Sequence, residues 1–544
     1  MSDPIVEALL QSFRLVAPEA LLVLGACVLF LGGTFRAGRN LWGGAALISV
    51  LAAAVGLFLI WPVVGADRSA PAAPAVFAST LQLDRLALLV KVIALAAGAV
   101  LILLGWKEIP DALAGECFAC VLVIAAGLSL VGSANDLIML FLALELISIP
   151  SYVLLYLPRY DDAAQEAAMK YFLLSVFSSA LLLFGFSYVY GLTGTTNLPA
   201  IAQALGRAGG FGLPLAALTA LVMIVAGLGF KITAVPFHFY APDVYQGTPT
   251  SNAALLAFMP KAAGFVAFLR VLAYVPTELV GGDGSLLLAG ARNPGLILGS
   301  DTLTLFWILA AVTMTLGNVL ALLQDNLKRL LAYSSVAHAG YMLIGLAVAA
   351  AMPPGAADVG GVEAVLFYLV AYGAMTLGAF GVLVYLHTPQ RPVETVDDLA
   401  GLSRSHPGVA LLMALFLFSL IGIPFTAGFA GKVFLLMGAI DVPGQSDPAQ
   451  ARLFRILALI GVLNAAAAAW YYLRVVTVMY LRTPLRPLEN RRAVPGLVAL
   501  AVCGLLTLAF GVYPWPLLRA VQEAVPRPAP PSALIAPAPV VGQR

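Results

Sequence analysis

Ionisable side chains inside long apolar segments are the residues of this sequence that could do chemistry. Glu145 lies in LFLALELISIPSY, Lys231 ends the apolar run before ITAVPFHFYAPDVYQG, and Lys261 lies in LLAFMPKAAGFVAF. His338 lies in YSSVAHAGYML and Lys432 in AGFAGKVFLLM. A charge at the centre of a membrane helix costs roughly 2.5–3.5 kcal/mol. Several such groups in one chain therefore indicate a function.

Proton binding is the chemistry that these groups can perform. Burial disfavours the charged form of a lysine, whereas a nearby carboxylate favours it. Movement of Glu145 relative to Lys231 would therefore load or unload a proton. A membrane potential of about 200 mV opposes each transferred charge by about 4–5 kcal/mol. We expect Lys261 and His338 to pass the proton laterally towards Lys432.

Structural roles remain open for the same residues. Glu145 and Lys231 could form a static ion pair, and His338 could simply be satisfied by a hydrogen bond. Lys432 could bind the end of a helix. Two further lysines lie nearer predicted helix ends, where an ammonium group can extend to the membrane surface: Lys91 and Lys170.

The composition sets the class of protein. The sequence is 61% hydrophobic and 10% charged, whereas soluble domains are typically about 25% charged. The pattern predicts an all-α polytopic membrane protein in a lipid bilayer. A net charge of +2 suggests no nucleic-acid partner. Cys117 and Cys120 form a CxxC without further ligands nearby, so we read them as buried apolar residues.

Apolar runs predict about fourteen transmembrane helices. The predicted spans are 16–35, 41–63, 83–106, 112–132, 136–157, 165–191, 213–238, 252–275, 302–323, 328–351, 361–387, 407–438, 453–481 and 495–517.

An internal repeat is indicated by matched stretches of sequence. NDLIMLFLALELISIPSYVL resembles QDNLKRLLAYSSVAHAGYML, with Asp136 aligned to Asp325 at an offset of 189. Pro236 in VPF aligns with Pro424 in IPF at an offset of 188. The common order and nearly constant offset favour duplication of a helical unit.

The repeat divides the chain into predicted domains. Two five-helix units, 112–275 and 302–481, follow three N-terminal helices in 1–111. An odd number of helices per unit means that the copies are inverted in the membrane, and the proline in the fourth helix of each predicts a broken helix. A C-terminal helix is predicted within 482–517, followed by a disordered Pro/Ala-rich tail, 518–544.

The chain resembles the antiporter-like membrane subunits of proton-pumping NADH-quinone oxidoreductase (respiratory complex I), in particular their subunit N branch. The resemblance covers roughly residues 110–480. It is carried by ELISIPSYVL, EAAMKYFLLSVFSSALLLFG, GFKITAVPFHFYAPDVYQGTPT, FMPKAAGF, NLKRLLAYSSVAHAGYML and TAGFAGKVFLL.

The resemblance implies a half-channel in each repeat, joined by a polar axis along the membrane. Glu145, Lys231, Lys261 and Lys432 match the family's proton-relay positions. A lysine at Lys432 fits subunit N, because the sister subunit M carries a glutamate there. The resemblance also implies that pumping is driven by NADH oxidation and quinone reduction elsewhere in the complex.

No cofactor is expected in this chain: NADH, FMN, iron–sulfur clusters and quinone are expected on other subunits. The expected partners are the other membrane subunits of complex I, and the expected location is a bacterial cytoplasmic membrane. Two alternatives remain. One is a subunit of a multi-subunit sodium/proton antiporter, and the other is a membrane scaffold whose buried ion pairs only fix helix packing.

Overall fold

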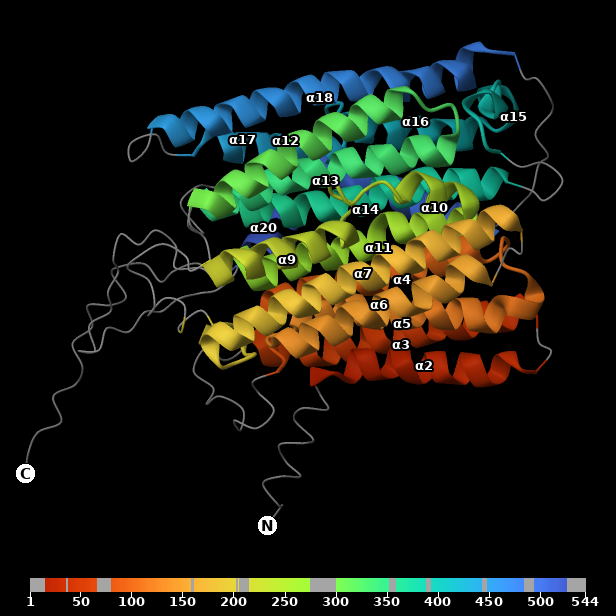
Figure 1. Cartoon of the computed structure of the whole chain (residues 1–544). Coiled ribbons are helices and arrows are strands. Elements are labelled where there is room, and N and C mark those ends of the chain that lie inside the picture. Colours follow the sequence, from red (N-terminus) through yellow and green to blue (C-terminus); the bar gives the residue numbers. More distant parts are fainter. Residues whose placement is uncertain are drawn as a thin grey trace, which may run out of the picture.

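A computed structural model describes residues 15–35, 38–65, 80–157, 161–201, 204, 215–273, 300–351, 359–387, 393–442, 448–483 and 494–525. Within these residues the chain is helical, with isolated β-bridges in place of extended strands. The helices lie side by side in one bundle (Figure 1). The all-α prediction is confirmed.

The chain begins with α2 (Ala17–Gly33), α3 (Arg39–Gly65) and α4 (Arg85–Gly105). Next come η1 (Asp111–Leu113), α5 (Ala114–Ser133), α6 (Leu137–Tyr156), α7 (Asp162–Thr193), α9 (Leu215–Lys231), α10 (Ala241–Gly247), α11 (Thr250–Phe268) and η2 (Leu269–Ala273). The later part contains α12 (Ser300–Leu322), α13 (Leu327–Ala351), α14 (Gly361–Leu386), η3 (Val396–Leu399), α15 (Leu402–Ser405), α16 (Pro407–Ile421), α17 (Ala427–Ile440) and α18 (Pro448–Leu481). It ends with α19 (Val494–Val512) and α20 (Trp515–Ala524).

The bundle has the surface of a multi-pass membrane protein. Among the described residues, 11 helices are long and apolar enough to cross a membrane. Shorter apolar helices are α2, α9, α16 and α17. Large apolar side chains are exposed along α3, α7 and α18, as expected for helices that face lipid. Each predicted span coincides with a helix or with the pieces of an interrupted one, and the count of fourteen crossings stays a prediction.

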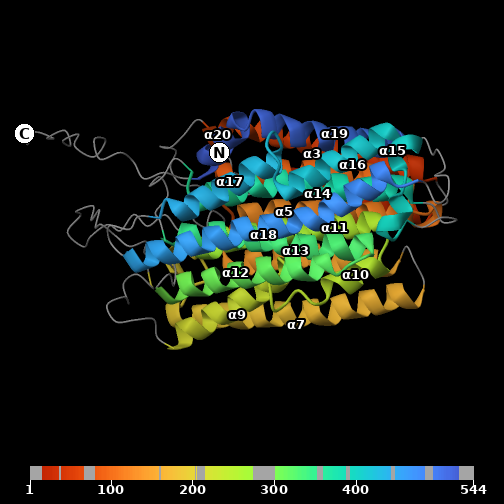
Figure 2. The ribbon, with the colours of Figure 1, turned by 90° about the horizontal axis from the view of Figure 1, so that it is seen from above.

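Two helices are broken where the sequence predicted it. Pro236 lies between α9 and α10, and Pro424 lies between α16 and α17. Both views show that the chain runs in opposite directions along the bundle in these two pairs (Figures 1 and 2). The opposite directions agree with inverted repeats, which is the architecture expected for the family that the sequence resembles.

Two short β-bridges occupy equivalent places in the predicted units. Asp136 at the start of α6 pairs with Asn197 after α7, and Asn326 at the start of α13 pairs with Thr395 after α14. Each bridge satisfies backbone groups that a helix start leaves unbonded. The first bridge also connects α6 to the segment after α7, and the second connects α13 to the segment after α14.

Helix α11 lies in the centre of the bundle, and every one of its side chains is buried. It packs against α4, α5, α6, α9, α13 and α14. This position explains why the helix carries so few polar residues. It also explains how Lys261, in its middle, is held away from both lipid and water.

The predicted disordered tail begins inside a helix. α20 extends to Ala524, and its apolar side chains Leu517, Leu518 and Val521 are buried. They pack towards α4 and α14, while polar residues occupy the other face. The prediction of disorder from 518 onwards was therefore wrong for the first residues of the tail, because Pro/Ala content obscured a short amphipathic pattern. Residues 526–544 lie outside the described residues.

Candidate functional site

Lys231 is the last residue of α9, where the helix breaks inside the bundle. Its side chain is 3% exposed. The ammonium donates to the Ser148 hydroxyl of α6 at 2.5 Å and lies 3.4 Å from the Ser175 hydroxyl of α7. Tyr152 donates to the same Ser175 hydroxyl at 2.8 Å. A buried cation is tolerated only with such partners.

Glu145 faces this lysine from α6 without a direct hydrogen bond to it. Its carboxylate Oε1 lies 3.9 Å from Lys231 Nζ, and the side chain is 21% exposed. Ser179 of α7 donates to the same carboxylate oxygen at 2.5 Å. Each charged group therefore has its own serine partner, so the separation between the two charges can change without leaving either of them unbonded.

Lys261 reaches from α11 to the second predicted unit. It is fully buried, and its ammonium donates to the Ser335 carbonyl of α13 at 2.6 Å. The Ser335 hydroxyl shares a 2.6 Å hydrogen bond with the hydroxyl of Tyr372. The backbone of α11 comes close to the break in α9 because Gly264 lacks a side chain. A Cβ at Gly264 would lie 3.3 Å from Lys231 Cβ and 2.5 Å from Ile232 Cγ2.

His338 lies on α13 one helical turn beyond Ser335. Its Nδ1 is 2.5 Å from the hydroxyl of Tyr368 on α14, and its Nε2 is 3.2 Å from the hydroxyl of Tyr472 on α18. The Tyr472 hydroxyl is also hydrogen-bonded to Ser334. Both ring nitrogens are thus satisfied by groups that can donate or accept a proton.

Lys432 lies on α17, just after the second break. Its ammonium donates to the carbonyls of Leu420 at 2.8 Å and Ile421 at 2.9 Å. These carbonyls end α16, where the helix dipole favours a cation. The ammonium also lies 4.7 Å from the centre of the Tyr341 ring, a cation–π contact. Lys432 therefore stands among neutral partners, whereas Lys231 faces a carboxylate.

Strained backbone is found at both breaks. Thr233, two residues after Lys231, has φ of 58°, and Phe425, beside Pro424, has φ of 67°. A residue with a Cβ rarely adopts this left-handed conformation, which costs roughly 1–2 kcal/mol. Such strain is retained mainly at functional sites. Both strained residues thus lie at the two helix breaks, one in each predicted unit.

The five predicted site residues form two groups. Glu145 and Lys231 face each other at 3.9 Å, and Lys261 contacts the helix that carries His338. Lys432 joins the second group through the Tyr341 ring, which lies 6.1 Å from the His338 ring. Sequence reasoning missed the serine and tyrosine partners. Their signal was helical spacing of polar residues, at three or four positions: Glu145 and Ser148, Ser175 and Ser179, Ser335 and His338, and Tyr368 and Tyr372.

The other lysines have different surroundings. Lys170 is partly exposed and pairs with Glu166 and Asp243. Lys91 is completely buried and pairs with Glu19 of α2, so the alternative that Lys91 extends to the membrane surface is wrong. Its neighbours from other helices fill the space around it, and sequence position alone gives no indication of this.

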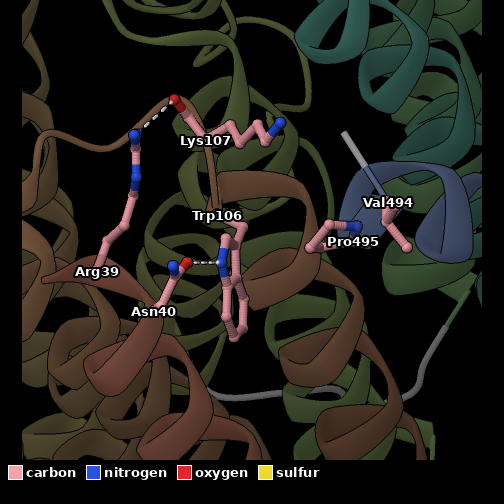
Figure 3. A pocket seen from close by; sticks show the side chains of 6 residues that line it. All are labelled: Arg39, Asn40, Trp106, Lys107, Val494 and Pro495. Carbon is pink, nitrogen blue, oxygen red and sulfur yellow. Dashed lines mark hydrogen bonds between the residues drawn. The ribbon is translucent and has the colours of Figure 1, made fainter. Parts of the chain in front are cut away.

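A pocket of about 300 Å³ lies apart from these buried groups, near the start of α3 and the end of α4, and Figure 3 shows the side chains that line it. It is lined by Arg39, Asn40, Trp106, Lys107, Val494 and Pro495. The Trp106 indole donates to Asn40, and the Arg39 guanidinium donates to the Lys107 carbonyl. In the described part of the chain, no group of three or more His, Cys, Asp or Glu side chains could hold a metal ion.

Comparison with known proteins agrees with this geometry. The sequence model of the family described as "NADH:quinone oxidoreductase/Mrp antiporter, TM" matches residues 134–300 and 284–445. NADH-quinone oxidoreductase subunit N of Anaeromyxobacter sp. (strain Fw109-5) is 38% identical over 96% of this chain and 98% of its own length. The chain belongs to this family.

Other relatives and solved structures are also similar to this chain. Subunit N 2 of Rhizobium meliloti (strain 1021) is 38% identical over 95% of this chain and 98% of its own length. A chain of respiratory complex I from Thermus thermophilus matches with a TM-score of 0.71 at 29% identity, covering 93% of this chain and 99% of that one. A chain of the Mrp complex from Dietzia sp. DQ12-45-1b shares the fold, with a TM-score of 0.73 at 19% identity and coverage of 95% and 97%.

Proposed function

We propose that this chain is a proton-translocating membrane subunit of an NADH:quinone oxidoreductase of the complex I type. The assignment to this complex is supported by relatives named NADH-quinone oxidoreductase subunit N that match nearly the whole chain. The assignment of proton translocation to this chain rests on one observation, the Glu145–Lys231 pair at a helix break. A broken helix with a buried charge is the usual sign of an ion pathway.

The energy of this pair is of the right size for pumping. Two unit charges about 4 Å apart attract each other by roughly 4 kcal/mol at an effective dielectric constant of 20. A membrane potential of about 200 mV opposes each transferred charge by about 4–5 kcal/mol. Separation of Glu145 from Lys231 would therefore change the proton affinity of Lys231 enough to drive release. The two serine partners allow that separation.

The remaining relay residues provide a lateral route. In this proposal Lys261 receives the proton and passes it towards the His338 cluster, whose tyrosine and serine hydroxyls both donate and accept. Lys432 ends the route, at carbonyl groups that stabilise its charged form. These roles for Glu145, Lys231, Lys261, His338 and Lys432 are predictions that substitution tests.

The surroundings of the subunit follow from the same proposal. Its partners are the other membrane subunits of the complex, in a bacterial cytoplasmic membrane. NADH, FMN, iron–sulfur clusters and quinone would be bound by other subunits. The driving reaction would therefore act on this chain mechanically or electrostatically through its neighbours.

Lys231→Ala tests the proposal. NADH-driven proton uptake is measured in membrane vesicles and normalised to assembled complex, with Lys107→Ala at a helix end as the control. We expect uptake and coupled NADH oxidation to collapse in Lys231→Ala while assembly holds, and both to persist in the control. Normal uptake per assembled complex in Lys231→Ala would instead support a scaffold with static ion pairs.

A subunit of a sodium/proton antiporter is the second candidate, because the family includes Mrp antiporters and the fold is shared with the Mrp complex. The identity of 19% to that chain shows the fold alone. The same vesicles separate the two candidates. Uptake that depends on NADH and persists without sodium supports the oxidoreductase, whereas sodium-driven uptake without NADH supports the antiporter.

A further inference from the structure

The two groups of relay residues lack a direct link. Lys231 donates to serines of α6 and α7, whereas Lys261 donates to Ser335 of α13. In the part of the chain that the structure describes, no hydrogen bond connects one group to the other. A proton that moves from Lys231 to Lys261 must nevertheless cross this space, and α10, the second piece of the broken helix, lies beside it.

Helix α10 packs against α7 on one side and α13 on the other, and both views place it between them (Figures 1 and 2). Tyr245 of this helix is 1% exposed. Its hydroxyl is buried and has no hydrogen-bond partner. A buried hydroxyl without a partner is destabilising, so nearly all such groups in proteins have a protein or water partner.

The surroundings of Tyr245 connect the two groups. Its helix packs against α7, which carries the Ser175 and Ser179 partners of the Glu145–Lys231 pair, and against α13, which carries the Ser335 partner of Lys261. The hydroxyl of Ser335 is bonded to Tyr372. On the α7 side, the Tyr171 ring lies edge-on to the ring of Tyr152, which donates to Ser175, with ring centres 5.7 Å apart.

We infer that Tyr245 is a further relay residue, whose hydroxyl carries protons between the Glu145–Lys231 pair and Lys261 through bound water. This inference rests on the proposed function. In each transfer the Tyr245 oxygen accepts a proton from a water on one side while its own proton leaves to the Ser335 or Tyr372 side. The hydroxyl keeps one proton throughout and must rotate back before the next transfer.

Packing alone does not account for the hydroxyl. The Tyr245 ring lies edge-on to Phe380, with centres 6.1 Å apart. A phenylalanine would make the same ring contact and would leave no unbonded polar atom. Other buried tyrosines of this bundle differ in this respect, because the Tyr240 hydroxyl donates to the Phe230 carbonyl and the Tyr471 hydroxyl donates to Asn318.

Tyr245→Phe in the whole complex tests the inference, with Tyr471→Phe as the matched control. A positioned proton-transfer group speeds its step by about 100-fold or more, so we expect NADH-driven proton uptake per assembled complex to fall by about 100-fold. We also expect the solvent deuterium isotope effect on NADH oxidation to rise, because proton transfer then limits turnover. A purely structural tyrosine would not change the isotope effect. Tyr245→His, which restores a donor and acceptor, should recover part of the uptake.

Two results would overturn the inference. One is Tyr245→Phe with the same uptake and isotope effect as Tyr471→Phe. The other is a loss of uptake that follows loss of assembly and is not recovered in Tyr245→His. Lys261→Ala shows whether only the role of Tyr245 fails or the proposed function fails as well. If Lys261→Ala abolishes uptake while Tyr245→Phe does not, only the role of Tyr245 fails. If Lys261→Ala pumps normally, the lateral route itself fails.

Discussion

Two buried glutamate–lysine pairs in this protein are built in different ways. In α2, α4 and α5, both Lys91 and Ser129 donate to one oxygen of Glu19, and the lysine and glutamate are 1% and 3% exposed. In the first predicted unit, the glutamate and lysine lie 3.9 Å apart, and the Glu145 side chain is 21% exposed. We call the first a closed pair, because its lysine and glutamate are directly bonded and buried. We call the second a loose pair, because its charges are not directly bonded and its glutamate is partly exposed.

Burial of an ion pair alone therefore does not indicate proton transfer, and the arrangement of its hydrogen-bond partners also matters. A closed pair resists separation, because either charge left alone in the interior is costly. A loose pair, with a separate hydroxyl for each charge, can vary its separation without leaving either charge unbonded. We therefore expect the Glu19–Lys91 pair to hold helices together and the Glu145–Lys231 pair to move protons.

The largest contrast is expected from matched glutamate substitutions. Glu145→Gln removes the charge that modulates Lys231, so we expect proton uptake per assembled complex to fall by about 100-fold, the scale of a lost acid–base group. Glu19→Gln leaves Lys91 unpaired in the interior and should destabilise the chain by about 3–5 kcal/mol. Assembled complex on native gels and its thermal inactivation midpoint measure the second effect. If Glu19→Gln lost uptake without loss of stability, the Glu19–Lys91 pair would take part in proton transfer, which would contradict its structural role.

Paired apolar substitutions sharpen the same contrast. Replacement of a whole buried ion pair by apolar residues is often neutral or stabilising by about 1–4 kcal/mol. We therefore expect Glu19→Met combined with Lys91→Met to keep the thermal midpoint that Glu19→Gln alone loses. Glu145→Met with Lys231→Met should keep a normal midpoint and still fail to pump. Recovery of pumping in the second double variant would contradict a relay role for that pair.

The sequence predicted most of the fold but only part of the site. Apolar runs and proline positions located the helices and both breaks, because membrane helices are defined by local hydropathy. Lys231 and Glu145 were found because each charge is costly where it stands. Glu19 follows Pro18 at the start of the first predicted span, and nothing in the local sequence indicates that it is buried. Its burial beside Lys91 depends on how α2, α4 and α5 pack, which no local pattern records.

A smaller effect is expected at the contact between α9 and α11. A Cβ at Gly264 would lie 2.5 Å from Ile232 Cγ2, closer than packed atoms allow. Gly264→Ala should therefore displace the end of α9 and alter the Lys231–Glu145 separation, lowering uptake by about tenfold, the effect of roughly 1.4 kcal/mol. Gly44, where an added Cβ meets nothing within 4 Å, provides the control Gly44→Ala. Equal uptake in the two variants would mean that the loose pair tolerates movement of α9.

The smallest effect is expected from the serine partners themselves. Ser148→Ala removes a 2.5 Å hydrogen bond to the Lys231 ammonium, and a hydrogen bond to a charged group is worth about 1.5–3 kcal/mol. Because Ser175 remains 3.4 Å away and can take over part of this role, we expect a fall in uptake of only a fewfold, with stability unchanged. Ser129→Ala should leave uptake normal and lower the thermal midpoint slightly, since Lys91 still pairs with Glu19. If both variants changed only the midpoint, the serines at Lys231 would be structural, and the looseness of that pair would have no role in pumping.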